Sequence, residues 1–256
     1  MDALRSFAED PMAHVPVGPD QERIEDPRFI VTFAPGAHFW SVSLGRLRFD
    51  ADEVGPGVAE VRALIAARGR HASVWSVGGS STPADLSARL IGLGMEQEGT
   101  SDVLVLTRPP ARGPAAFEVR EVRSLQDLQA WIEVSALAFG WPEEDTLDER
   151  ARAQDTWRAE RGNSAAARLL AFDDGRPIAV GRAERSPQGL FLGGGATLPS
   201  DRRRGAMTAL LAAAWDDAVG RGTPALVTYG GAMSAPVLAG LGFEKIGEMA
   251  HLIDRS

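Results

Sequence analysis

The chain has 256 residues, of which 44% are hydrophobic and 24% charged, and its formal net charge is −8. This composition predicts one large or two small domains with a substantial core, and the acidic balance disfavours a general nucleic-acid-binding surface. No apolar run is long enough to span a bilayer, and a chain without cysteine forms neither a disulfide nor a thiolate metal site. We therefore expect a cytoplasmic protein with no nucleic-acid and no membrane partner.

Residues 1–110 are expected to form a first unit. Runs of β-branched and aromatic residues predict strands over 28–33, 39–43, 73–77 and 102–106. Apolar periodicity predicts helices over 57–68 and 83–93.

A proline-rich connector follows this unit. Three prolines and one glycine lie between Thr107 and Ala115, a composition that favours an extended, helix-free segment. We therefore predict a linker at 111–116 and a second domain over 117–256.

The second unit alternates strands and helices. Predicted strands cover 117–122, 168–172, 177–183, 189–193, 225–229 and 243–253. Predicted helices cover 125–139 after the N-cap Ser124, 147–161, the segment between Arg204 and Gly220, and 234–241. The helix that follows strand 189–193 provides a crossover to a parallel strand. The fold class is therefore α+β with a mixed sheet.

The stretch Gly193–Leu211 carries the strongest functional signal. It combines a strand end, a turn at Pro199, three arginines at 202–204, Gly205 and an apolar helix. Unpaired backbone N–H groups and the positive dipole end at a helix start favour an anion, such as a phosphate or diphosphate. Arginines add permanent positive charge. The same arginines also fit a solvated helix start that binds nothing.

Three consecutive glycines, Gly193–Gly195, precede this motif. They fit a β-bulge that aims one N–H into a binding site, and they also fit a flexible loop. Their position before the arginines favours the bulge.

The segment Thr197–Leu211 resembles the acetyl-CoA-binding motif of the GNAT N-acetyltransferase superfamily. That motif has Gln or Arg, two variable residues, Gly, one variable residue, then Gly or Ala; Arg202 and Gly205 match it, whereas Met207 stands in place of the small residue. The segment Ser234–Phe243 resembles the closing helix and Leu-Gly-Phe motif of the same family.

The resemblance covers residues 117–256 and implies a GNAT-like fold with acetyl-CoA as cosubstrate. It assigns to that cosubstrate Ala196, Thr197, Leu198, Arg202, Arg203, Arg204, Gly205, Ala206, Met207, Thr208 and Ser234. The first unit resembles a truncated, degenerate copy of such a domain, and we expect no cofactor there because it lacks an Arg/Gly-rich loop.

The resemblance leaves the proton-transfer groups open. Leu238 occupies the position where many family members have a catalytic tyrosine. Tyr229, the chain's only tyrosine, is a candidate proton donor or a packing residue, and Glu184 is a candidate base or half of a surface ion pair. Trp141 and Glu143 are candidates for the acceptor pocket, although Glu143 also fits the acidic start of a helix. No metal site is expected.

The sequence therefore predicts an acetyl-CoA-dependent N-acetyltransferase that acts on a small-molecule amine by direct attack in a ternary complex, as a monomer or homodimer. The alternative is a catalytically silent acyl-CoA sensor or partner-binding module.

Overall fold

A computed structural model describes residues 2–36, 38–111 and 117–256. Most of the predicted linker, residues 112–116, lies outside the described residues. The helices are α1 (Asp2–Glu9), α2 (Val54–Ala66), α3 (Leu86–Gly92), α4 (Leu125–Phe139), α5 (Glu143–Glu160), α6 (Ala206–Gly220) and α7 (Ala235–Gly240), with short 3-10 turns η1 (Pro11–Ala13), η2 (Phe39–Ser41) and η3 (Pro199–Asp201). The strands are β1 (Glu22–Asp26), β2 (Phe29–Phe33), β3 (Val42–Gly45), β4 (Ser73–Gly78), β5 (Glu96–Leu106), β6 (Glu118–Glu121), β7 (Ala166–Asp173), β8 (Arg176–Ser186), β9 (Gly189–Thr197), β10 (Leu226–Gly230) and β11 (Glu244–Asp254).

All strands join one 11-stranded sheet in the order β1-β2-β3-β4-β11-β5-β10-β9-β8-β7-β6. The strands β6 to β9 are antiparallel, whereas β9 and β10 are parallel across the α6 crossover. The expected α+β class with a mixed sheet is confirmed.

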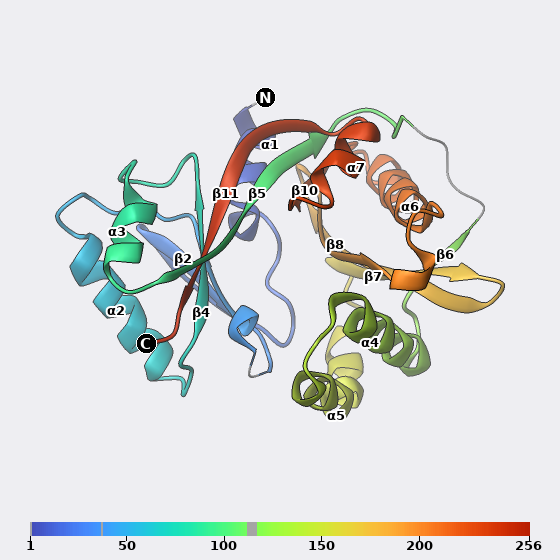
Figure 1. The fold of residues 1–256 in the computed structure, drawn as a ribbon, viewed down its shortest axis with the longest axis horizontal. Helices are drawn as coiled ribbons and strands as arrows, with labels where there is room; N and C mark the ends of the chain where they lie inside the picture. Colours follow the sequence, from blue (N-terminus) through green and yellow to red (C-terminus); the bar gives the residue numbers. More distant parts are fainter. Residues whose placement is uncertain (1, 37, 112–116) are drawn as a thin grey trace.

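The part of the chain up to residue 110 is called the first half below, and the part from residue 117 on is called the second half. Helices cover the sheet on different faces in these two halves (Figure 1). In the second half, α4 packs on one face of β7 to β9 through Leu128 and Ile132, α5 packs against α4, and α6 packs on the other face of the sheet through Ala206 and Leu210. In the first half, α2 and α3 cover β2, β3 and β4.

The two halves exchange strands at the centre of the sheet. β11, from the second half, lies between β4 and β5 of the first half, and β5 in turn pairs with β10. These two long strands form the arch that joins the halves in Figure 1. The Arg62 guanidinium on α2 donates to both carboxylate oxygens of the buried Asp254 at 2.9 and 3.0 Å, which fixes the end of β11 in the first half.

Some predicted elements were wrong in position. Residues 39–43 were expected to be a strand, but 39–41 form the turn η2, because the Trp40 N–H is capped by His38 and β3 starts only at Val42. Helix α5 starts at Glu143, four residues before the predicted 147, since Pro142 takes the N-cap position and the acidic residues occupy the first turn, where the helix dipole favours them. Helix α1 and strand β1 were missed.

Candidate functional site

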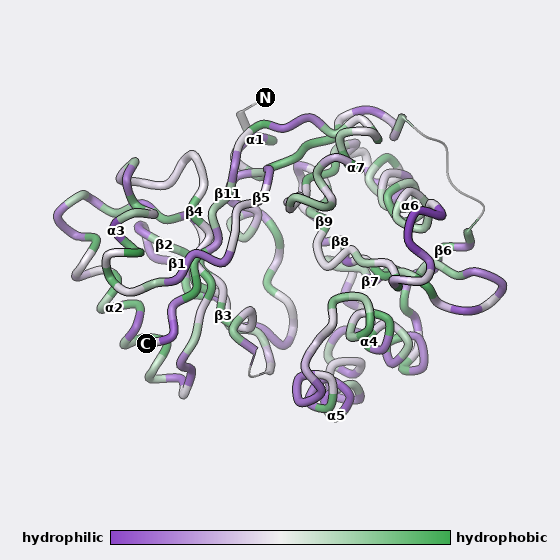
Figure 2. The backbone as a smooth tube through the Cα atoms, in the orientation of Figure 1, coloured by the Kyte–Doolittle hydropathy of each residue, from purple (hydrophilic) through white to green (hydrophobic). Residues whose placement is uncertain are grey.

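After the turn between β9 and α6, several backbone N–H groups at the start of the helix have no hydrogen-bond partner within the helix. The first hydrogen bond of α6 runs from the Ala209 N–H to the Gly205 carbonyl at 3.0 Å, so the N–H groups of residues 206–208 have no partner within it. Arg203 and Gly205 have φ angles of +65° and +95°. Such a left-handed backbone turns neighbouring N–H groups toward one point. In Figure 2 this turn is strongly hydrophilic.

A buried carboxylate anchors the same turn. Asp201 is 2% exposed and accepts hydrogen bonds from Arg176 at 2.8 and 3.1 Å and from Arg204 at 2.7 Å. Arg204 also lies 2.8 Å from Asp173. The bond from Arg176 is the main cause that lowers the pKa of Asp201 to about 2. Arg204 is therefore engaged in holding the turn together.

All three arginines of the motif have exposed side chains, Arg204 included. Arg202 donates from Nε to the Thr197 carbonyl and from Nη2 to the Ala138 carbonyl at the end of α4, both at 3.3 Å. These bonds are long, and the side chain remains at the surface beside the unpaired N–H groups. Arg202 is thus placed to contact an anion at the start of α6.

Strands β9 and β10 separate in front of this turn. Their parallel pairing ends at Thr228 opposite Leu192, where the Thr228 hydroxyl donates to the Leu192 carbonyl at 2.9 Å. Beyond that point β9 pairs with β8 alone within the described part of the chain, through Gly193, Ala196 and Thr197. One edge of β9 is therefore open at the carboxyl ends of a parallel pair, the end at which ligands bind in open α/β sheets.

The predicted bulge is present at the open edge. Residues 194 and 195 of β9 stand opposite the single residue Gly181 of β8, and Gly194 has a φ of +58°. The Trp131 indole N–H of α4 donates to the Gly181 carbonyl at 3.3 Å. A Cβ added at Gly195 would lie 3.2 Å from Met207 Cε, so Met207 packs against the bulge.

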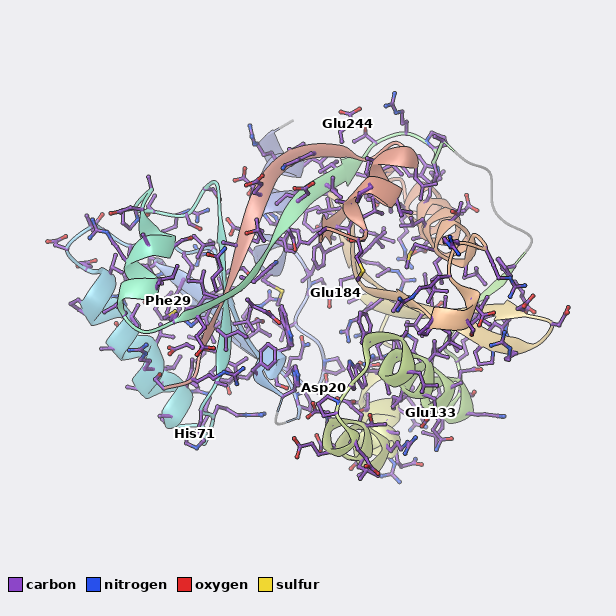
Figure 3. All side chains as sticks on the ribbon, in the orientation of Figure 1. Asp20, Phe29, His71, Glu133, Glu184 and Glu244 are labelled. Carbon is purple, nitrogen blue, oxygen red and sulfur yellow. The ribbon has the colours of Figure 1, made fainter. Side chains whose placement is uncertain are left out.

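Glu184 lies on β8 opposite Phe191 of β9 and points between the two halves (Figure 3). Its carboxylate accepts a hydrogen bond from Arg182 Nε at 3.1 Å, and its side chain is 22% exposed. Arg182 in turn lies 3.8 Å from Glu160 of α5. Glu184 is therefore a carboxyl side chain at a partly open position, held by Arg182.

Tyr229 lies on the same side of the sheet as Glu184. Its ring packs edge-on against Phe191 at 5.2 Å, and its hydroxyl donates to the Glu9 carbonyl of α1 at 3.4 Å. Burial raises the pKa of the Tyr229 phenol well above its usual range, and Asp10 and Glu9 act in the same direction. A phenol in this setting keeps its proton.

The two residues considered for the acceptor pocket stand between α4 and α5. Trp141 is half-buried and stacks on Phe139 with ring centroids 6.5 Å apart. Glu143 is exposed in the first turn of α5. Asp145 of the same turn lies 3.8 Å from His38 Nε2 of the first half, so the halves contact each other here.

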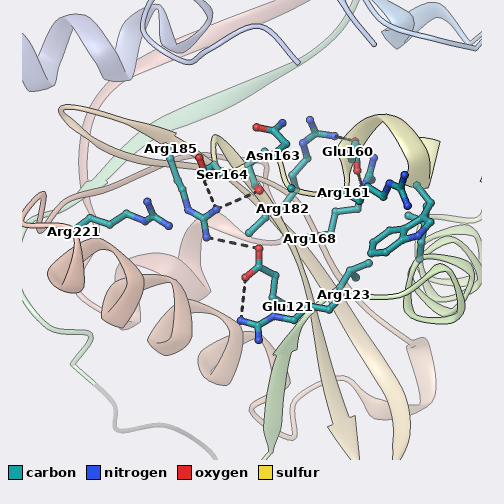
Figure 4. Close-up of a pocket in the computed structure, with 16 residues that line it drawn as sticks. Glu121, Arg123, Glu160, Arg161, Asn163, Ser164, Arg168, Arg182, Arg185 and Arg221 are labelled. Atoms are coloured by element: carbon teal, nitrogen blue, oxygen red, sulfur yellow. Dashed lines mark hydrogen bonds and ion pairs between the residues drawn. The ribbon is translucent and has the colours of Figure 1, made fainter. Parts of the chain in front are cut away.

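A cavity of about 420 Å³ lies at the start of β7 and the end of β8, and Glu184 is not among the residues that line it (Figure 4). Its lining includes the six arginines Arg123, Arg161, Arg168, Arg182, Arg185 and Arg221. Carboxylates neutralise most of them. Glu121 lies 3.7 Å from Arg123 and 3.9 Å from Arg185, and Glu160 accepts two bonds from Arg168.

The described ranges contain no cluster of three or more His, Asp or Glu side chains suited to a metal ion. None of the helices described is both long and apolar enough to cross a bilayer.

Comparison with known proteins identifies the family. Residues 128–243 match the family model described as the acetyltransferase (GNAT) family. Over 209 residues the chain is 30% identical to a mycothiol acetyltransferase of Streptomyces coelicolor; the match covers 78% of this chain and 65% of that protein. The chain therefore contains a GNAT acetyltransferase segment over residues 128–243, and it spans just under two thirds of the length of the curated relative that it matches.

Solved structures agree at the level of the fold. A GCN5-related N-acetyltransferase from Kribbella flavida superposes with a TM-score of 0.72 at 18% identity, covering 99% of this chain and 96% of that one. A tandem GNAT protein from the clavulanic acid biosynthesis pathway superposes with a TM-score of 0.60 at 16% identity, covering 93% and 84%. The GNAT-like fold is therefore confirmed over nearly the whole chain.

Within this GNAT fold, the residues that the motif assigned to the cosubstrate fall along the open edge of β9 and the start of α6. Ser234 stands apart, as the N-cap of α7 with its hydroxyl donating to the Gly231 carbonyl at 3.3 Å. Leu238 is buried among the apolar side chains below α6, so its position is filled by packing.

Several residues of the site were missed in the sequence. Arg182 could have been found, because residues two apart on a strand share a face and Glu184 had been considered. Asp201 lies inside the motif, but its bond from Arg176 depends on a hairpin that precedes it in the chain. Thr228 has no signal in the sequence.

Proposed function

We propose that the chain is an acetyl-CoA-dependent N-acetyltransferase that acetylates the amino group of a small molecule. The observation that carries the proposal is the open edge of β9 that leads into a helix start with unpaired N–H groups. An extended chain can pair with that edge while an anion lies at the helix start.

The residues present fit coenzyme A. The N–H groups of residues 206–208 and the exposed arginines 202 and 203 would hold the diphosphate, and the edge at Ala196, Thr197 and Leu198 would pair with the pantetheine amides. Asp201 and Arg204 keep the turn in shape, since their ion pair is internal to the protein. Ser234 is assigned by the family resemblance alone.

Acetyl-CoA supplies an acetyl group activated as a thioester. The bulge at Gly194 and Gly195 would direct a backbone N–H toward the thioester oxygen, where charge develops as the amine attacks. Glu184 would take the proton that the acceptor ammonium must lose, either directly or through water. Trp141 and Glu143 would border the acceptor.

The domain boundaries belong to the same proposal. We propose a degenerate GNAT-like unit over 1–110 and a cosubstrate-binding domain over 117–256, joined at 111–116. Support comes from the motif and the open edge, both of which lie in the second half.

Calorimetry with acetyl-CoA and thiol release over a panel of primary amines test the function. We expect binding, turnover on at least one amine, and a decrease in kcat of about tenfold to a hundredfold for Glu184→Gln. Glu118→Gln, an exposed β6 residue, is the matched control. Tight binding of acetyl-CoA without turnover on any amine would favour the acyl-CoA sensor instead, and the absence of binding would refute both functions.

A further inference from the structure

Arg23 of β1 carries two buried nitrogens without a partner. Its side chain is 6% exposed, and Nη1 donates to the Val15 carbonyl at 2.9 Å and lies 3.9 Å from the carboxylate of the exposed Glu25. Nε and Nη2 are shielded from solvent and have no hydrogen-bond partner among the described residues. Buried polar groups are nearly always paired, because leaving one unpaired costs more than a hydrogen bond normally contributes.

A second unpartnered group lies next to it. Thr32 of β2 stands directly opposite Arg23 in the strand register, so the two side chains share a face of the sheet. Thr32 is 3% exposed, and its hydroxyl has no partner in the described structure. Two polar side chains, one of them cationic, thus lie together in the interior with unused hydrogen-bonding capacity.

The unpartnered nitrogens form a specific fork. Elsewhere in this protein the same two atoms, Nε and Nη2, each hold one oxygen of a carboxylate: Arg62 with Asp254 at 2.9 and 3.0 Å, Arg168 with Glu160 at 2.8 and 2.8 Å, and Arg150 with Glu133 at 2.6 and 2.6 Å. A planar, two-oxygen anion is what this fork matches best.

The position of Arg23 connects it to the proposed active site. Val15, which accepts its bond, belongs to the apolar cluster that also contacts Phe191 and Tyr229, and Phe191 lies opposite Glu184. Burial lowers the pKa of the Arg23 guanidinium, and the carboxylates of Glu25 and Glu184 oppose that shift. The charge of Glu184, from the second half, thus acts on an arginine of the first half.

We propose that Arg23 and Thr32 bind a carboxylate of the acceptor, so that the acceptor is an amino acid or another amine that carries a carboxylate. The first half of the chain would then recognise the acid end of the acceptor, while Glu184 faces its amino group. This inference rests on the proposed function, because it names the substrate class of that site.

Acetyl transfer to matched acceptors tests the inference. The twenty L-amino acids are compared with their carboxamides in the wild type, Arg23→Gln, Arg23→Lys and the control Arg68→Gln, whose arginine contacts Glu22 of the same strand at the surface. We expect Arg23→Gln to lower kcat/KM for the acids at least about tenfold, mainly through KM, and to change that for the carboxamides less than about twofold. Arg23→Lys is expected to retain part of the preference. An equal loss on acids and carboxamides, or a preference that survives in Arg23→Gln, would overturn the inference.

A stability measurement separates this inference from the proposed function. Unfolding midpoints are recorded with N-acetyl-L-amino acids, with the matching N-acetyl amides and with O-phosphoethanolamine. We expect the acids alone to raise the midpoint of the wild type, and Arg23→Gln to lose that rise. Without added ligand, Arg23→Gln is expected to be as stable as the wild type or more so, because a buried guanidinium with two unpaired nitrogens and only a long ion pair to the exposed Glu25 has been removed. A response to the phosphate compound alone, or to no acid, would overturn the carboxylate assignment even if acetyl transfer is found.

Discussion

Arg204 lies 2.7 Å from the buried Asp201 carboxylate and 2.8 Å from Asp173, so an arginine of the cosubstrate motif is committed to the protein itself. Arg202, two residues earlier, has two long bonds to backbone carbonyls and an exposed side chain. We therefore expect loss of Arg204 to affect the stability of the protein and loss of Arg202 to affect the binding of acetyl-CoA.

We predict that Arg204→Ala lowers the unfolding midpoint, whereas Arg202→Ala leaves it nearly unchanged and weakens acetyl-CoA binding about five- to tenfold, as expected for one lost charge-assisted bond. Thermal unfolding and calorimetry on both variants measure this. If Arg202→Ala destabilised the protein more than Arg204→Ala, the assignment of their roles would be wrong.

The Asp201 carboxylate should make stability depend on acid pH. Its pKa is lowered from the ordinary 3.8 to about 2, chiefly by the bond from Arg176. A depressed pKa in the folded state contributes stability that is present above the ordinary value and is lost as the pH falls through about 2. We therefore expect the gap in unfolding midpoint between wild type and Asp201→Asn to be largest above pH 4 and to shrink toward pH 2.

Asp216→Asn, an exposed substitution on α6, is the control for that titration. A gap between wild type and Asp201→Asn that stays constant from pH 6 to pH 2 would contradict the prediction.

Gly205 should not tolerate a side chain. Its φ of +95° is a conformation that other residues adopt only with strain, so Gly205→Ala is expected to cost about 1–2 kcal/mol of stability. The same strain would turn the N–H groups of the helix start, and acetyl-CoA affinity is expected to fall about tenfold. Unfolding by urea and calorimetry give the two numbers.

Gly220→Ala at the other end of α6 is the matched variant, since an added Cβ there meets nothing within 4 Å. It should leave affinity unchanged and stabilise the helix by about 0.5 kcal/mol. Equal effects of the two substitutions on binding would argue against a role for the helix start.

A substitution at Tyr229 can decide whether this residue is a proton donor or a packing residue. Because its hydroxyl donates to the Glu9 carbonyl and its pKa is raised by burial, we expect packing to be its main role. Tyr229→Phe should then change kcat less than about twofold and reduce stability by about 1 kcal/mol, the contribution of one hydrogen bond. Thr82→Val, which also removes one hydroxyl that donates to a backbone carbonyl, that of Phe49 at 3.1 Å, is the control. A decrease in kcat of a hundredfold for Tyr229→Phe alone would restore the phenol as the proton donor.

Local patterns predicted the second half well. The N-cap Ser124 and the glycines before the arginine motif each specify their structure within a few residues. The parallel pairing across α6 was predicted from the helical crossover that follows strand 189–193. Helix α5 began earlier than predicted because the sequence alone does not distinguish acids before a helix from acids in its first turn.

The remaining features depend on contacts between distant residues. Nothing near Asp201 in the sequence shows that Arg176 binds it, and nothing near Arg23 shows that its guanidinium is buried beside the second half. The strands that pair with β5 and β11 could not be predicted from the sequence either, because pairing between strands far apart in the chain leaves no local pattern.

The exchange of β5 and β11 has a consequence for synthesis on the ribosome. β4 and β5 are translated early, but β11, the strand that fills the place between them, comes after the entire α6 and β10 segment. Until then the nascent chain holds two unsatisfied strand edges, which are sites of aggregation and slow closure. Neither half can complete its sheet by itself, so the two must mature together.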